Sequence, residues 1–236
     1  MITLTKRDGK YCVYSNGQWI GLIELFFNPY HSTNCYVKIE FDSWNADISE
    51  ELFHKIKDIA GRPLQVMVNS INVDVINFLT AGGFICKRKC YEMEVCFSDY
   101  IGNVVNLECC RCFPGDKDYE FCCRMMYDYY VNTHKAINPW TSDFATFCSK
   151  LPETVLYNKT EDSICSIAFI EDNEIAYVCG SDEEHFCRFA QSLISLMFSE
   201  HDKVVFECDD CDAFAIILKN MFKSQADSCF CTYVLE

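Results

Sequence analysis

The chain has 236 residues, of which 50% are hydrophobic and 15% aromatic, enough to bury a sizeable core in one large domain or two small ones. Its formal net charge of −15 at pH 7 repels phosphate backbones and anionic headgroups, so we expect neither nucleic acid nor a membrane as a partner. The uncharged apolar stretches fall short of the roughly 20 residues that span a bilayer, and the first residues lack a signal-peptide core. We therefore expect a cytoplasmic protein.

Eighteen cysteines would suggest a disulfide framework in a secreted chain. Without a secretion signal, reduced and largely buried thiols are the simpler interpretation. Metal binding is a candidate role for the cluster 109–112, for Cys122-Cys123, and for Cys208 and Cys211, which have C-x-x-C spacing. Because no histidine knuckle accompanies them, the sequence predicts no metal site, and a thiol or metal protein stays a third hypothesis.

Alternating apolar residues and a turn at Ser15-Asn16-Gly17 predict an antiparallel meander at the start of the chain. Apolar residues at helical spacing over 48–59, ending at Gly61, predict a helix. The expected elements of the first half are strands over 11–14, 19–27 and 35–41, a helix over 48–59, a strand over 64–68, a helix over 73–81 and a strand over 84–95.

The second half opens with two predicted helices separated by Pro139, and then returns to the order of elements of the first half. Its expected elements are helices over 119–132 and 142–151, strands over 154–157, 163–170 and 174–179, a helix over 184–198, a strand over 203–207, a helix over 212–222 and a strand over 228–235. This repeat of pattern predicts an internal duplication, with halves at 1–98 and 119–236 and a connection over 99–118.

The order of elements, the segment Asn77–Phe84 (NFLTAGGF) and the following Tyr91–Glu94 (YEME) resemble the GNAT N-acetyltransferase superfamily. The resemblance implies an α/β (α+β) chain of two tandem GNAT-like folds, each a mixed, mostly antiparallel sheet flanked by helices. The first half lacks the family's first two helices. The turn between those helices is matched by residues 129–140.

The same resemblance implies transfer of an acetyl or other acyl group from acetyl-CoA to an amine. Its pyrophosphate would lie at the N-terminus of the helix that follows the fourth strand, where the helix dipole favours anions. The family's glycine-rich turn corresponds to 185–190, where only Ala190 agrees and Arg188 replaces a glycine. The cofactor contacts that the resemblance implies are Tyr177, Val178, Arg188 and Ala190.

Two features depart from the family. Acidic residues surround both candidate helix starts and would repel a pyrophosphate, although they also serve as ordinary helix caps; they are Asp42, Asp47, Glu50 and Glu51 in the first half, and Asp182, Glu183 and Glu184 in the second. The position of the family's tyrosine acid is taken by Leu79 and by Ile217. The tandem folds are therefore degenerate in their CoA-binding motif.

No motif places a catalytic residue. A general base could be Tyr177, His185, Glu174 or Glu40, all on or beside the expected central strands, although a solvated or capping role is the simpler explanation of each. His134 is a candidate substrate contact in a loop, where exposure is the ordinary expectation. An aromatic stripe could line a cleft, but its helical spacing favours core packing; it comprises Phe121, Tyr127, Tyr129, Tyr130, Trp140, Phe144 and Phe147.

Two functions from different classes remain open. The first is an acyltransferase whose competent site lies in the second half, acting on an amine or a basic peptide that the acidic chain attracts. The second is a catalytically degenerate GNAT fold that binds a peptide or protein between splayed central strands. The sequence leaves open the acceptor, the acyl chain and whether the chain forms a homodimer.

Overall fold

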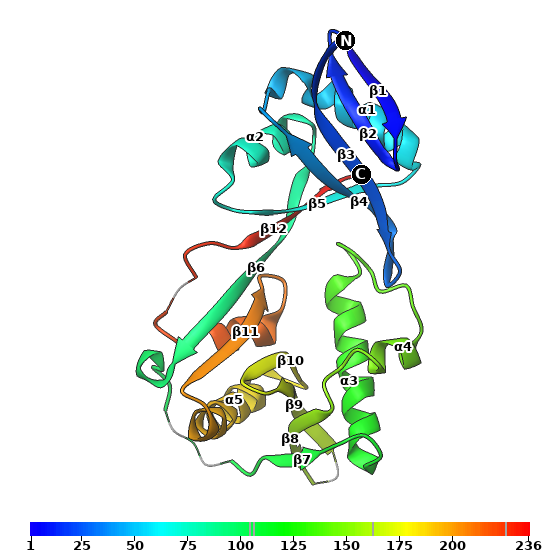
Figure 1. Cartoon of the computed structure of the whole chain (residues 1–236). Coiled ribbons are helices and arrows are strands. Elements are labelled where there is room, and N and C mark those ends of the chain that lie inside the picture. Colours follow the sequence, from blue (N-terminus) through cyan, green and yellow to red (C-terminus); the bar gives the residue numbers. More distant parts are fainter. Residues whose placement is uncertain (104, 106, 162, 225) are drawn as a thin grey trace. The chain divides into compact units, whose positions relative to one another are not determined.

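The computed structural model describes residues 1–103, 105, 107–161, 163–224 and 226–236, which form two compact units (Figure 1). Unit 1 comprises Met1–Lys89, His134–Ser142 and Ser228–Glu236, and unit 2 comprises Cys90–Thr133 and Asp143–Asp227. Neither unit is continuous in sequence. The sequence boundaries 1–98, 99–118 and 119–236 stay a prediction.

Unit 1 is a mixed sheet with two helices. Its strands follow the order β1-β2-β3-β4-β5-β12-β6, and β1 to β4 form the predicted antiparallel meander. Its elements are β1 (Ile2–Arg7), β2 (Lys10–Ser15), β3 (Gln18–Asn28), β4 (His31–Phe41), the 3-10 turn η1 (Ala46–Ile48), α1 (Ser49–Ala60), β5 (Leu64–Asn69), α2 (Val73–Ala81), the start of β6 (Ile85–Cys96) and β12 (Phe230–Leu235).

Two-residue turns build the meander. Asp8-Gly9 joins β1 to β2, and Asn16-Gly17 joins β2 to β3, with all four residues at positive φ. Asp-Gly and Asn-Gly suit hairpin turns because both central residues must adopt left-handed conformations. The sequence analysis predicted the second turn and missed β1, whose exposed residues are mostly polar.

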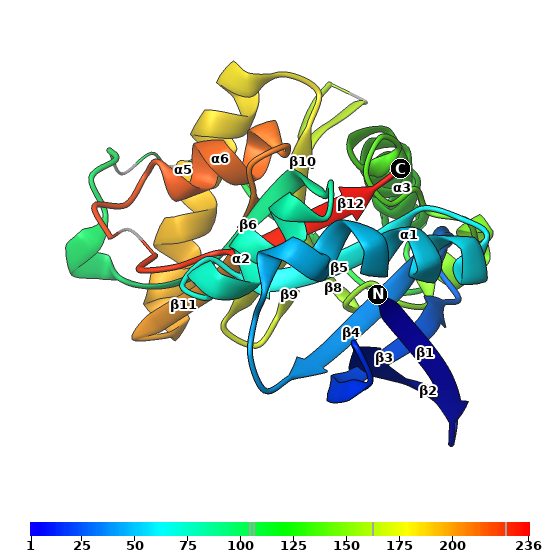
Figure 2. The same ribbon diagram turned by 90° about the horizontal axis from the view of Figure 1, so that it is seen from above.

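The helices α1 and α2 bury their apolar faces together with β5 and β12 (Figure 2). Phe53 packs edge-on against Phe78 and Phe84, at ring-centroid distances of 5.4 and 4.7 Å. The Ser49 hydroxyl donates a hydrogen bond to the carbonyl of Phe78 and so ties α1 to α2. This packing holds the N-terminus of α2 beside the end of β4.

Unit 2 has the strand order β6-β11-β10-β9-β8-β7. The sequence analysis treated the segment of β7 as part of a connection. The elements are β6 from residue 90 onward, η2 (Phe97–Asp99), β7 (Cys110–Cys112), α3 (Lys117–His134, whose last residue belongs to unit 1), α4 (Phe144–Cys148), β8 (Thr154–Thr160), β9 (Ser163–Glu171), β10 (Glu174–Gly180), α5 (Glu183–Glu200), β11 (Lys203–Asp209) and α6 (Ala213–Lys219).

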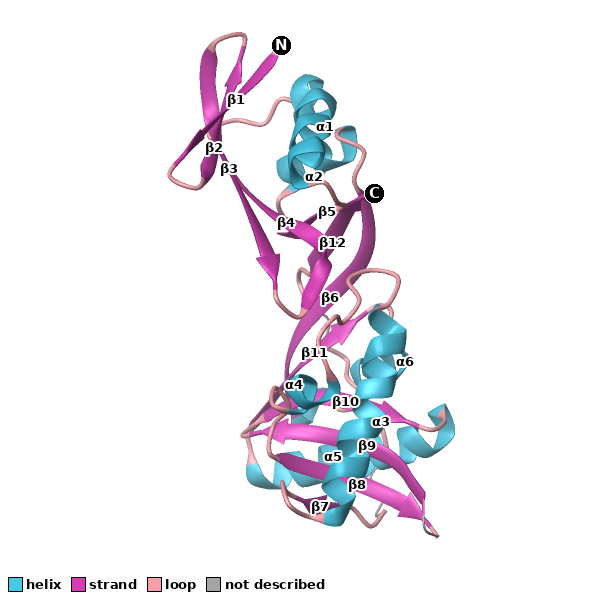
Figure 3. Ribbon diagram, turned by 90° about the vertical axis from the view of Figure 1, so that its right-hand side faces the viewer, coloured by secondary structure: helices cyan, strands magenta, loops and turns pink. Residues whose placement is uncertain are grey.

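Helices flank this second sheet as well, as Figure 3 shows. The helix α5 buries an apolar stripe against β8 to β11, with Phe186, Phe189 and Leu193 fully buried. Among the described residues, no helix is long and apolar enough to cross a bilayer.

Each sheet contains a strand from the other half of the sequence. In unit 1, β12 pairs antiparallel with β5, from Phe230 opposite Asn69 to Leu235 opposite Leu64. In unit 2, residues 90–96 of β6 pair antiparallel with β11. The two halves of the duplication therefore exchange their last strands between the two units. The order of elements along the chain does not reveal this exchange.

Candidate functional site

The two central parallel strands separate in both units. In unit 1, β4 and β5 pair only at Cys35 with Leu64 and at Tyr36 with Gln65. In unit 2, β10 and β11 pair only at Glu174 with Val205 and at Ile175 with Phe206, after which the register of β10 shifts. Ligands of α/β sheets bind outside the carboxyl ends of strands at such a divergence. Each unit therefore offers one position for a site.

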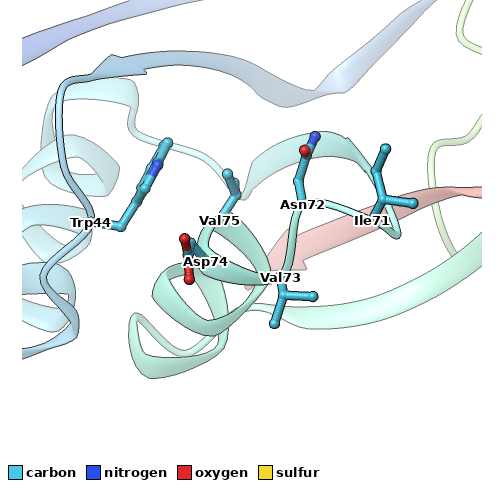
Figure 4. A pocket seen from close by; sticks show the side chains of 6 residues that line it. All are labelled: Trp44, Ile71, Asn72, Val73, Asp74 and Val75. Carbon is cyan, nitrogen blue, oxygen red and sulfur yellow. The ribbon is translucent and has the colours of Figure 1, made fainter.

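Unit 1 has a pocket of about 260 Å³ at this position (Figure 4). Trp44, in the loop after β4, stands on one side, and the start of α2 forms the other side. The residues from that side are Ile71, Asn72, Val73, Asp74 and Val75.

Four of the six residues that line this pocket have apolar side chains, although polar atoms form more of its exposed lining. The Trp44 ring is held by Phe41 and Phe78, at centroid distances of 5.4 and 5.3 Å. Ile71 and Val73 are 69% and 58% exposed, although both are large aliphatic side chains. Asn72 precedes α2 without a side-chain cap, and the first amide of the helix, that of Val73, donates to the carbonyl of Ile71 at 3.0 Å. The pocket suits an apolar or aromatic group, and Asp74 is the charged residue in its lining.

In unit 2, the side chain of Asp182 caps the N-terminus of α5. One carboxylate oxygen of Asp182 accepts the backbone N–H of His185 at 2.9 Å, and the other lies 2.9 Å from the His185 ring. The hydrogen bond from that backbone N–H is the main cause that lowers the pKa of Asp182, so the cap is charged at neutral pH. Glu183 and Glu184 follow in the first turn. The capping interpretation is confirmed here.

These residues do not fit a pyrophosphate. Residues 185–190 do not form a turn, because α5 begins at Glu183 and takes their backbone groups into the helix. The amide that could bind an anion is bonded to a carboxylate, and three acidic side chains surround it. We derive no step through a cofactor at α5.

The four predicted cofactor contacts are spread over two elements. Val178 and Ala190 are buried in the packing between β10 and α5, Arg188 is exposed on α5, and Tyr177 is half-buried on β10. The structure does not gather these side chains around one space. They stay a prediction.

Two of the predicted bases, Glu174 and Tyr177, lie near Glu207. Glu207 was not among the sequence-based predictions. Glu207 has an exposed side chain whose pKa is raised by partial desolvation, followed by the charges of Asp209, Glu92 and Glu174, although the Cys90 thiol donates a hydrogen bond to it. Glu92 lies directly opposite Glu207 in the β6–β11 ladder. Burial, followed by the charges of Glu207 and Glu174, raises the pKa of Tyr177. Alternation along β11 could have indicated Glu207, because it places this side chain on the opposite face of the strand from the core residues Phe206 and Cys208.

The remaining candidates have structural roles. Glu40 accepts a hydrogen bond from Lys38 at 2.9 Å, which lowers its pKa and weakens it as a base. His185 belongs to the α5 cap. The expected exposure of His134 is wrong, since its side chain is only 5% exposed at the end of α3.

The segment His134–Ser142 packs on unit 1. His31 Nδ1 lies 2.7 Å from the carbonyl of Asn138, and Asn34 donates to the carbonyl of Ile137 at 3.0 Å. The Trp140 ring stacks on Tyr30 at a centroid distance of 5.3 Å. These contacts place the segment over the first residues of β4.

Most of the aromatic stripe packs internally. Tyr127 contacts Phe144 and Phe147, and Tyr130 contacts Phe147 and Tyr177. Phe121 is an exception and is 59% exposed. The packing interpretation therefore holds for these contacts, while Trp140 belongs to the segment on unit 1.

None of the eighteen cysteines, all of which lie in the described parts of the chain, forms a disulfide. Within the described parts of the chain, no group of three or more histidine, cysteine or acidic side chains is arranged to hold a metal ion. Burial raises the pKa of several thiols, among them Cys109 to about 11 and Cys208 to about 12.

Comparison with solved structures identifies the architecture. A GCN5-related N-acetyltransferase from Sphaerobacter thermophilus superposes with a TM-score of 0.59 at 9% identity, over 97% of this chain and 80% of that one. The chain has the GNAT fold. A GNAT-family acetyltransferase from Colwellia psychrerythraea gives a TM-score of 0.51 at 6% identity, over 96% and 85% of the two chains. No protein-family model and no curated protein sequence matches the chain. The GNAT fold therefore rests on structure, and confirms the expected fold class.

Proposed function

We propose that the protein is an N-acyltransferase that moves an acetyl or other acyl group from acetyl-CoA to an amine or a basic peptide. The observation that carries this proposal is the divergence of the central strands within a GNAT fold, which opens to a pocket in unit 1. In this fold, that divergence is the position at which a ligand reaches the strand ends.

In unit 1, the pocket fits the apolar arm of an acyl thioester. Trp44, Ile71 and Val75 would hold it, and the bound thioester would supply the activated acyl group. The start of α2, which lacks a side-chain cap, could bind a carbonyl oxygen or an anionic group of that arm.

The acceptor is proposed to be cationic. Carboxylates of Asp209, Glu92 and Glu174 lie close enough to Glu207 for their charges to raise its pKa. Such a set attracts an ammonium group or a basic peptide by charge. Neither half places a tyrosine acid at the family's position, because Leu79 and Ile217 stand there.

A second candidate is a binding module without catalysis. The observation that favours it is the α5 cap, in which Asp182 occupies the anion position. A GNAT fold without cofactor contacts would still offer the carboxylates of unit 2 to a basic peptide.

Acyl transfer can be tested directly by mass spectrometry. The purified, reduced protein is incubated with isotopically labelled acetyl-CoA and a panel of polyamines and lysine peptides. We expect a labelled amide whose rate of formation falls when Glu207 is replaced, as in Glu207→Gln. The matched control is Glu94→Gln, another exposed glutamate of the β6–β11 pair that is bonded to Lys203. Binding of a basic peptide with no acylated product would contradict the transferase and support the binding module.

A further inference from the structure

Two phenylalanines fill the region between the starts of α5 and α6 in unit 2. Phe186, from the first turn of α5, and Phe214, from the first turn of α6, are both buried, with ring centroids 4.8 Å apart. They lie beside Gly180, the last residue of β10. A β-carbon added to Gly180 would approach Phe186 Cβ to 3.0 Å and Phe214 Cε1 to 3.1 Å. The carboxyl end of β10 is therefore packed by side chains.

A buried polar contact closes the same region from α3. The Tyr129 hydroxyl donates to Asp212 Oδ1 at 2.7 Å, and its ring lies 5.2 Å from that of Phe214. The same oxygen of Asp212 accepts the backbone N–H groups of Phe214 and Ala215. The amides at the start of α6 are thus used within the unit.

Unit 1 differs from unit 2 both in the cap of the helix and in the packing beside it. The helix α2 corresponds to α6 in the order of elements, yet its Asn72 makes no side-chain cap, whereas Asp212 caps α6 twice. The space beside α2 is a pocket next to Trp44, with Ile71 and Val73 exposed at its rim. Equivalent positions of the duplicated fold are therefore open in unit 1 and packed in unit 2.

We infer that unit 1 alone takes the acyl donor, because unit 2 closes the matching position with the plug formed by Phe186, Phe214, Tyr129 and Asp212. This inference rests on the proposed function and reverses the sequence-based assignment of the competent site to the second half. Unit 2 then holds no donor.

The test is a hydrogen–deuterium exchange footprint of the full chain with acetyl-CoA. We expect slower exchange over 41–49 and 70–76, with no change over 180–190. Two variants accompany it. Val73→Asp adds a negative charge at the pocket rim without touching the core, since Val73 is 58% exposed, and should weaken acetyl-CoA binding about tenfold. Trp44→Ala should weaken it at least as much.

Arg188→Ala is the matched control, because Arg188 is exposed on α5 and was the sequence-based cofactor contact. It should leave the affinity unchanged. Protection over 180–190, or weaker binding in Arg188→Ala, would overturn the assignment to unit 1 and leave the acyltransferase proposal standing. Absence of binding by the unaltered protein would overturn both.

Discussion

Asp212 illustrates how much one side chain does in this fold. A single carboxylate oxygen accepts hydrogen bonds from the Tyr129 hydroxyl and from two backbone amides, and so joins α3 to the start of α6. Burial is the main cause that raises the pKa of Asp212, and these donors oppose that rise. The residue was expected at the start of a helix, but its partner on α3 lies 83 residues away and leaves no local signal.

Replacing Asp212 should therefore cost more than an ordinary cap. We expect Asp212→Ala to lower the free energy of unfolding by roughly 2–4 kcal/mol, since it removes a cap and leaves the Tyr129 hydroxyl without its acceptor. Asp212→Asn keeps an acceptor oxygen and should cost clearly less. Urea denaturation measures both, with the exposed Asp202→Ala as control. Equal losses in the Ala and Asn variants would contradict this role.

The thiols should differ in reactivity by burial. Burial raises the pKa of Cys35, Cys122, Cys179 and Cys208, so few of these thiols ionise at neutral pH. We expect iodoacetamide at pH 7.5 to spare them in the folded protein and to label all eighteen cysteines in denaturant. Peptide mass spectrometry reads out each site, and rapid labelling of Cys179 in the folded protein would contradict the packing described.

At the scale of elements, periodicity predicted most of the fold. The helix expected over 48–59 is α1 at Ser49–Ala60, and the helix expected over 184–198 is α5 at Glu183–Glu200. The strand β1 was missed although Asp8-Gly9 marks its turn, because its alternation is largely polar. The strand β7 has only three residues. The exchange of β6 and β12 was beyond prediction, since it depends on pairing between distant segments.

The candidate site was less predictable than the fold. The family resemblance matched residues 185–190 to a glycine-rich turn, but the helix that Asp182 caps runs through that stretch. Phe186 lies in that nonmatching stretch and Trp44 belongs to no motif, and nothing local shows that Phe186 fills a gap and that Trp44 borders a pocket. Glu207 required knowledge of which strand faces it. Sites built from several strands need tertiary structure.

The segment His134–Ser142 should make the stability of unit 1 depend on pH. Burial is the main cause that lowers the pKa of His31 from 6.5, and the nearby charges of His134 and Arg88 lower it further, while the carbonyls of Asn138 and Pro139 oppose this. A histidine with a lowered folded pKa contributes its full stability above 6.5, and loses it as the pH falls below that value.

We therefore expect the unfolding free energy of the wild type to fall more steeply between pH 7.5 and 5.5 than that of His31→Asn. Urea denaturation at both pH values gives the difference between slopes, and His54→Asn, at an exposed histidine of α1, controls for removal of an imidazole. Parallel slopes for His31→Asn and the wild type would show that His31 is not the responsible group.

At the scale of the whole molecule, the chain is a duplicated GNAT fold whose copies have diverged in opposite ways. Unit 1 keeps an open pocket beside α2, and unit 2 packs the equivalent position around Phe186 and Phe214. The formal charge of −15 disfavours a polyanionic ligand and favours a cationic acceptor, so the proposed binding of acetyl-CoA would have to depend on its uncharged arm. One chain should therefore bind one donor.

Calorimetric titration of the reduced protein with acetyl-CoA, and with desulfo-CoA as a non-reactive analogue, tests this central claim most directly. The account predicts saturable binding of one ligand per chain, with an affinity that rises as salt screens the repulsion between the acidic protein and the cofactor phosphates. No binding of either ligand at millimolar concentration, or two equivalent sites per chain, would contradict it.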